Sequence, residues 1–187
     1  MKTKIFLIAS ILMLTGFSTL FAQGFQPPSA GKAAVYLVRV TGYGSGNSFD
    51  YFFQDQFIGN WAGVHYQRFE CKSGEQVIWA SSENKDFVTS DLKEGGTYII
   101  IIDVIMGAMK AHVGLRPISA DDKDFDRVKK MIEKDKPVEL KADKVEARGK
   151  KLADFIQKEL AHYNETKDKP SIKHLTSDMA IPEDKLK

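Results

Sequence analysis

From residue 32 to residue 118, short apolar or alternating runs are separated by turns rich in Gly, Ser, Asn and Asp. Thr97–Ile105 is the longest run. Its β-branched residues occupy both faces, which predicts a strand in the middle of a sheet. The other predicted strands span residues 33–40, 48–54, 56–61, 64–71, 76–81, 87–92 and 109–115. Short strands without helices between them predict a mainly β domain over residues 32–118, an antiparallel β-sandwich of the immunoglobulin or prealbumin kind.

After residue 118 the apolar residues recur every three or four positions, the spacing of one helix face. A first helix is expected to begin at Ser119 as its N-cap and to end before Pro137. A second helix is expected from Ala142 to Tyr163. The helical extension therefore covers residues 119–164. Residues 165–187 are polar and are expected to form a loosely ordered tail.

The first 22 residues have the features of a secretory signal peptide. A basic start, Met1–Lys4, precedes the apolar run Ile5–Leu14, and a small residue, Ala22, stands at the expected cleavage site. The apolar run has about ten residues, whereas a membrane-spanning helix needs about 20. We therefore expect cleavage between Ala22 and Gln23, a linker over residues 23–31, and a periplasmic or secreted protein with no transmembrane segment.

Removing this segment changes the charge balance. The whole chain has 27 basic and 25 acidic residues, and the signal peptide contains two of the lysines and no acid, so 25 of each sign remain. A neutral protein has no basic field to attract nucleic acid or anionic lipid. The single cysteine, Cys71, excludes an internal disulfide and is expected to be buried.

Several turn and strand motifs resemble those of a known family. They are Gly31–Tyr36, Ile58-Gly59, Glu94–Tyr98 and Leu115-Arg116-Pro117. In this order they resemble an uncharacterised bacterial envelope family, domain of unknown function number 2846, over roughly residues 31–120. The resemblance implies an exported β-sandwich module, often a lipoprotein. This chain lacks the lipid-bearing cysteine, and the family offers no established catalytic residues.

Asp103 is the most unusual residue because it interrupts the isoleucine-rich strand. A buried carboxylate must be paired or must shift its pKa. It is either a catalytic or ligand-facing acid, or a structural residue. As a structural residue it pairs with Lys110, Arg116 or Arg39, or it lies at an exposed edge of the strand. We favour the structural role. A Cys71–His65 pair is disfavoured because six residues of extended strand span roughly 20 Å.

Three other candidate sites have simpler explanations. The histidines (His65, His112, His162 and His174) show no metal-ligand spacing. Residues 121–126 are acid-rich but lack the glycine and the closing glutamate of a calcium loop, so we interpret them as an acidic first helical turn. The glycine-rich segment 42–46 precedes a strand rather than a helix, which favours an interstrand loop over a phosphate-binding loop.

Five aromatic residues could form a platform for sugars or peptides, although core packing is the favoured interpretation. They are Tyr43, Tyr51, Trp61, Tyr66 and Trp79.

The sequence thus predicts an exported, non-enzymatic module, with an unknown protein, peptide or glycan of the envelope as its partner. No catalytic, cofactor-binding or metal-binding residue is assigned. Two alternatives stay open. One is a small hydrolase-type enzyme that uses Asp103 with a nearby histidine. The other is an assembly component that acts through its C-terminal helices.

Overall fold

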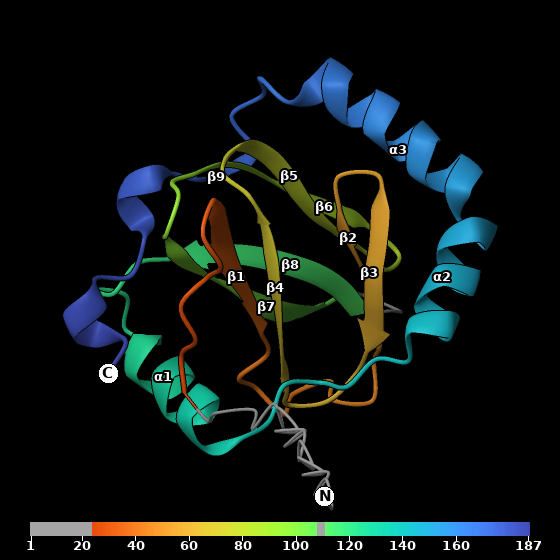
Figure 1. Cartoon of the computed structure of the whole chain (residues 1–187). Coiled ribbons are helices and arrows are strands. Elements are labelled where there is room, and N and C mark those ends of the chain that lie inside the picture. The colour runs from red at the N-terminus through yellow and green to blue at the C-terminus, as the bar shows by residue number, and fades with distance from the viewer. Residues whose placement is uncertain (1–23, 108–110) are drawn as a thin grey trace, which may run out of the picture.

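The structure, a computed structural model, describes residues 24–107 and 111–187. Two β-sheets face each other, and helices cover their outer faces (Figure 1). The predicted signal peptide, its cleavage site and Lys110 lie outside the described residues. The prediction of a β-rich two-sheet domain followed by helices is confirmed.

The elements follow the predicted order closely. The strands are β1 (Lys32–Val38), β2 (Phe49–Phe53), β3 (Gln56–Trp61), β4 (Tyr66–Lys72), β5 (Gly74–Ser81), β6 (Lys85–Leu92), β7 (Thr97–Met106), β8 (Ala111–Ile118) and β9 (Lys173–Leu175). The helices are α1 (Phe125–Lys134), α2 (Ala142–Lys151), α3 (Ala153–Thr166) and the short 3-10 helices Ser177–Met179 and Glu183–Lys185.

The first sheet has the strand order β4-β1-β7-β8. Its central pair, β1 and β7, is parallel, with Tyr36 opposite Ile99. Ile100 and Ile102 of β7 point toward the other sheet, whereas Ile99 and Ile101 point outward into a second apolar layer. The expected fully antiparallel sandwich is therefore wrong at this pair. The apolar residues on both faces of β7 predict that this strand is buried on both sides. They do not determine whether the neighbouring strand runs parallel or antiparallel to it.

The second sheet has the order β3-β2-β5-β6-β9, and its last pair, β6 and β9, is also parallel. Strand β9 comes from the polar C-terminal segment. Leu175 is fully buried in the core between the sheets, and Ile181 is buried beside α1. The expectation of a loosely ordered tail is wrong, because two apolar residues anchor this segment and β6 offers it a free edge.

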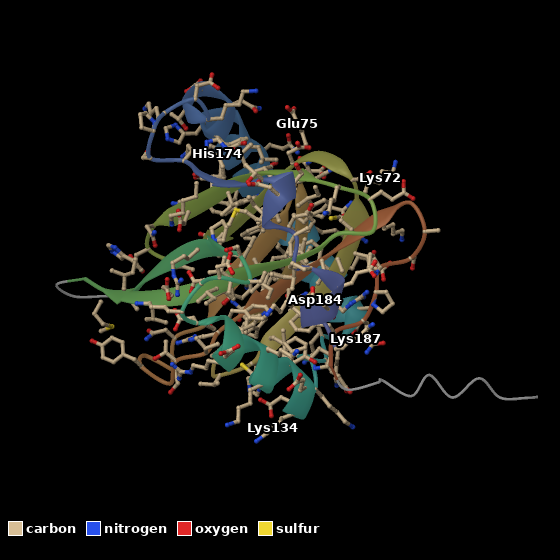
Figure 2. The ribbon with its side chains drawn as sticks, turned by 90° about the vertical axis from the view of Figure 1, so that its left-hand side faces the viewer. Lys72, Glu75, Lys134, His174, Asp184 and Lys187 are labelled. Carbon is tan, nitrogen blue, oxygen red and sulfur yellow. The ribbon has the colours of Figure 1, made fainter. Side chains whose placement is uncertain are left out.

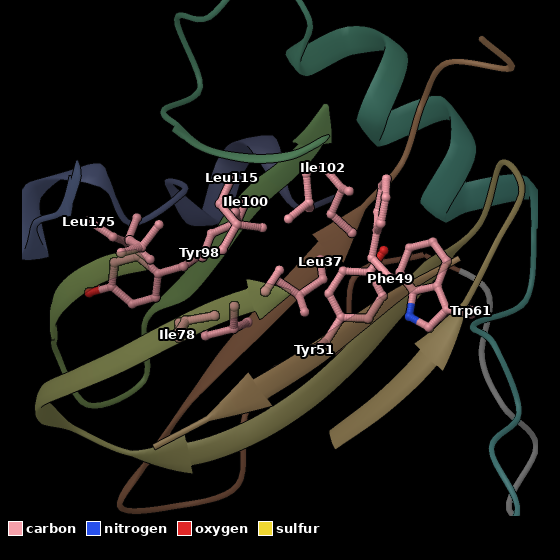
Figure 3. Close-up of a cluster of buried hydrophobic side chains, with 14 of the residues drawn as sticks. Leu37, Phe49, Tyr51, Trp61, Ile78, Tyr98, Ile100, Ile102, Leu115 and Leu175 are labelled. Carbon is pink, nitrogen blue, oxygen red and sulfur yellow. The ribbon is translucent and has the colours of Figure 1, made fainter. Parts of the chain in front are cut away.

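The core between the sheets contains aromatic and branched side chains from both layers (Figure 3). Trp61 and Tyr51 pack with their ring centroids 4.9 Å apart, and Tyr98 occupies the opposite end near Leu175. The Trp61 indole N–H donates a hydrogen bond to the side-chain oxygen of Gln67 on β4. Because Gln67 also donates to the carbonyl of Ile58, it joins one edge of the first sheet to an edge of the second.

Helix α1 covers the outer face of the first sheet. Its predicted apolar stripe is confirmed, since all four of its residues are buried: Phe125, Val128, Met131 and Ile132. However, the helix begins at Phe125 and not after Ser119. The preceding residues form turns, in which the N–H of Asp122 bonds to the carbonyl of Ser119 and the N–H of Phe125 bonds to that of Asp122.

Helices α2 and α3 replace the single helix predicted for residues 142–163. The chain leaves helical geometry at Leu152, with φ −96° and ψ 3°. Beyond this break, α3 lies over the outer face of the second sheet, where Ile156 and Tyr163 are buried. There the Phe87 ring stacks between Trp79 and Tyr163, at centroid distances of 5.3 and 5.2 Å.

The free edge of β8 is closed by side chains rather than by another strand. Asn84, in the loop between β5 and β6, donates to the carbonyl of Val113 at 2.8 Å and accepts from its N–H at 2.9 Å. Asp86 accepts from the N–H of Leu115 and pairs with Lys173. Exposed sheet edges promote aggregation, so these contacts protect the edge while they join the two sheets.

We predict that Asn84→Ala will lower the free energy of unfolding by about 1–3 kcal/mol, because it removes two hydrogen bonds to the backbone of Val113. The Val113 N–H keeps a second acceptor in the Ser82 hydroxyl at 3.0 Å, so the loss falls mainly on the carbonyl. Asn164→Ala is the matched control, since the exposed Asn164 has no hydrogen-bond partner among the described residues, and it should change stability by less than about 0.5 kcal/mol. Urea denaturation measures both. Equal effects would contradict the edge-closing role of Asn84.

Candidate functional site

The glycine-rich loop after β1 is held by a buried arginine. Arg39 donates hydrogen bonds to the carbonyls of Gly44 and Asn47, at 2.5 and 2.7 Å, and its guanidinium lies 5.4 Å from the centre of the Phe49 ring. The strand β2 follows the loop, as predicted. Two carbonyls of the loop face the Arg39 cation. The N–H groups of Tyr43, Ser45 and Asn47 are bonded within the loop itself, so they are not turned toward an anion as in a phosphate-binding loop.

Asp103 forms an ion pair with Arg116 at 3.2 Å, which confirms one of the expected structural partners. Arg116 also binds Asp122 at 3.1 Å and Asp124 at 2.6 Å. These two acids therefore serve as partners of a strand arginine and lie before α1. The prediction that they belong to an acidic first helical turn is wrong, and Asp126 alone occupies that turn.

No hydrogen bond or ion pair joins Asp103 to a histidine in the part of the chain that the structure describes. His112 lies on the same face of the β7–β8 hairpin, at a diagonal position, because it opposes Ile105 while Asp103 opposes Gly114. His65 precedes β4, which is separated from β7 by β1. Strands β1 and β7 likewise separate Cys71 on β4 from His112 on β8. Within the described residues, no group of three or more His, Cys, Asp or Glu side chains is placed to hold a metal ion.

Cys71 is buried in the core, as predicted, and its sulfur lies 3.9 Å from the carbonyl oxygen of Ala33. Burial raises the pKa of this thiol from 9.0 to about 11, and the nearby Glu70 carboxylate adds to the rise. A thiolate is therefore disfavoured at neutral pH, the opposite of what a nucleophilic cysteine requires.

The aromatic residues considered as a binding platform mostly belong to the core, which confirms the favoured interpretation for four of them. Trp61 is 5 % exposed and Trp79 is fully buried, as is Tyr51, and Tyr66 is 3 % exposed. Tyr43, in the glycine-rich loop, is 62 % exposed. One exposed ring cannot form the aromatic platform that the sequence suggested.

A polar cleft lies between the last turns of α3 and the outer face of the second sheet. Its volume is about 360 Å³. Figure 2 shows two of its lining residues, Glu75 and His174, on the same side of the molecule beside α3. We call it the α3 cleft. It is lined by Gln54, Glu75, Gln76, Val77, Thr89, Leu160, Tyr163, Asn164, Lys167, Asp168 and His174.

The cleft forms where the apolar surface of the second sheet ends. Under α3, Trp79 of β5 pairs with Phe87 of β6. Two residues further along these strands, Val77 pairs with Thr89. On its other side, Thr89 pairs with His174 of β9. The hydroxyl groups of Thr89 and Tyr163 lie 2.7 Å apart and form a hydrogen bond. This contact marks the end of the tight packing, and the polar residues beyond it stay open to solvent.

The floor of the α3 cleft is held in place by several contacts of Gln54. This residue has φ 52°, the only positive φ of a non-glycine residue in the described part of the chain. Its N–H bonds to the carbonyl of Val77, and its carbonyl accepts from the Trp79 indole at 3.0 Å. Its side-chain amide donates to the Gln76 oxygen at 2.7 Å. The positive φ is the usual geometry of a two-residue hairpin turn, here Gln54-Asp55 between β2 and β3.

The walls of the α3 cleft consist of side chains that are available to a ligand. Five of them are exposed and have no hydrogen-bond or ion-pair partner among the described residues, namely Glu75, Asn164, Lys167, Asp168 and His174. Sequence reasoning missed this site. Two features of the sequence could have pointed to it. One face of β5 changes from the apolar Trp79 to the acidic Glu75, and the polar tail contains His174. Neither feature indicates a cleft unless the position of α3 over the sheet is known.

No protein-family model matches the chain, and no curated protein matches it. The resemblance to the domain of unknown function number 2846 stays a prediction. None of the helices in the described part of the chain is long and apolar enough to span a membrane.

We predict that the Cys71 thiol will react with a disulfide reagent at pH 8 only when denaturant unfolds the protein, since about one folded molecule in a thousand carries the thiolate at that pH. The raised pKa also stabilises the fold below pH 9, and this contribution is lost as the pH rises toward 11. Between pH 8 and pH 11 the parent protein should therefore lose up to about 2 kcal/mol more stability than Cys71→Ala. Rapid labelling without denaturant would contradict the burial.

Proposed function

We propose that this protein is an exported, non-enzymatic binding module and that the α3 cleft is its ligand site. Export is supported by the signal-like start of the chain, and the resemblance to the envelope family agrees with it. The proposed likeness to an immunoglobulin- or prealbumin-like sandwich is limited to the two packed sheets. The strand pairs β1–β7 and β6–β9 are parallel, so the likeness does not extend to a fully antiparallel arrangement. No cofactor is part of the proposal.

One observation carries the assignment of the site. In the α3 cleft, a floor fixed by hydrogen bonds lies beside polar side chains that have no partner among the residues that the structure describes. Polar groups held in place on a rigid scaffold bind a ligand at little entropic cost. The cleft volume lies near the lower end of the range for small-ligand sites, about 300–1,000 Å³.

The alternatives receive less support. The Asp103 carboxylate is paired with Arg116, and His65 is separated from it by a strand. His112 is its diagonal neighbour on β8, but no hydrogen bond joins the two among the described residues. An assembly component that acts through its C-terminal helices would need an uncovered apolar stripe on them. Instead, Ile156 and Tyr163 pack on the second sheet together with Val145, Leu152 and Leu160.

Export is tested by expressing the full chain in a bacterial host and by measuring the mass of the protein outside the cytoplasm. We expect a chain that begins at Gln23, because the small side chain of Ala22 suits signal peptidase. Ala22→Trp should block cleavage. The control Ala30→Trp, in an exposed position of the linker, should not. An uncut protein in the parent sample would contradict the proposal.

Binding at the α3 cleft is tested by nuclear magnetic resonance with a library of amino acids, short peptides, saccharides and nucleotides. At least one compound should shift the amide signals of Thr89, Asn164 and His174 in a saturable manner. His174→Ala should weaken the binding about five- to tenfold, the loss expected for one hydrogen bond. His65→Ala changes another exposed histidine and is the control. Binding that shifts only signals outside the cleft would refute this site.

A further inference from the structure

The charges around the α3 cleft favour a ligand with a positive group. Glu75 and Asp168 contribute two carboxylates, whereas Lys167 contributes one ammonium group. Strand pairing also places Asp91 opposite Glu75 at the same end of β5 and β6. In addition, α3 ends at Thr166 beside the cleft, and the C-terminal end of a helix dipole is negative. These groups favour a cationic ligand over a phosphate or a nucleotide.

The neutral groups of the α3 cleft are mainly amides. Gln54 and Gln76 lie on the floor, and Asn164 projects from the last turn of α3. A side-chain amide has a donor and an acceptor side by side, the same pair that a peptide group presents. The Gln54 amide donates to Gln76 through its nitrogen, which leaves its oxygen free to accept from a ligand N–H.

The α3 cleft lacks the feature that sugar sites commonly use. Its only Phe, Tyr or Trp ring, that of Tyr163, is 6 % exposed and stacks on Phe87 with an angle of 24° between the planes. Its hydroxyl is already bonded to Thr89. The Tyr163 face is therefore closed to a pyranose, and apart from the small imidazole ring of His174 the site offers a saccharide only hydrogen bonds.

Together, the excess of carboxylates, the helix C-terminus and the free amides define one chemical class. We infer that the α3 cleft binds a short peptide that carries a free ammonium group. The ammonium group pairs with Glu75 and Asp168, and peptide N–H and C=O groups bond to the amides of Gln54 and Asn164. The inference rests on the proposed function, because it names the ligand class of the same cleft.

The probes are tetra-alanine with free termini, the same peptide with an acetylated N-terminus, chitotriose and adenosine monophosphate. Each is titrated by nuclear magnetic resonance into the protein recovered after export. Free tetra-alanine should shift the signals of Thr89, Asn164 and His174 in a saturable manner. Acetylation should weaken binding at least about tenfold, since it removes the charge that two carboxylates recognise.

The variant Glu75→Gln/Asp168→Asn keeps the shape of the cleft and removes its negative charge. It should weaken binding of tetra-alanine about tenfold and bring the free and acetylated peptides to similar affinity. Asp184→Asn is the control, because Asp184 is an exposed acid in a different part of the molecule (Figure 2). It should leave both affinities unchanged. Thermal unfolding confirms that each variant is folded.

The outcomes separate this inference from the proposed function. Equal binding of the acetylated and the free peptide would overturn the ammonium requirement. If chitotriose or adenosine monophosphate shifts the cleft signals and tetra-alanine does not, the peptide inference fails while the binding site stands. If the probes that bind shift only signals away from the cleft, both fail.

Discussion

The packing of helices onto the outer faces of both sheets is the contact on which the rest of the structure depends. Strand β7 carries isoleucines on both faces, so the first sheet must bury its outer face as well as its inner one. Helix α1 meets this requirement with four buried residues. The second sheet shows Phe52, Trp79 and Phe87 on its outer face, and α3 covers them. Neither sheet would be stable in water with these residues exposed.

This constraint also explains the C-terminal segment. Once α3 has crossed the second sheet, the chain returns along the free edge of β6, and β9 pairs there. The return inserts Leu175 into the core between the sheets and places Ile181 beside α1. Lys173 forms an ion pair with Asp86, whose carboxylate also accepts a hydrogen bond from a backbone N–H of β8. The polar tail thus helps to join the two sheets, although its composition is typical of a loose end.

The α3 cleft follows from the same geometry. The stack of Trp79, Phe87 and Tyr163 ends at the hydrogen bond between Tyr163 and Thr89. Beyond this point the helix and the sheet diverge, and both surfaces become polar. The cleft therefore combines a hydrogen-bonded floor with walls that are exposed to solvent.

The sequence by itself determined the strands from β1 to β8, the apolar stripe of α1 and the burial of Cys71, because each depends on a local repeat of apolar residues or on one side chain. It also limited Asp103 to a few structural partners, among them Arg116. Only the tertiary structure decided that β1 and β7 are parallel, that the predicted long helix bends at Leu152, and that residues from the tail complete the core. The α3 cleft belongs to this second group. Its lining residues are far apart in the chain, among them Gln54, Thr89, Tyr163 and His174. A local sequence pattern does not determine which strands are neighbours in a sheet or where a helix stops covering that sheet.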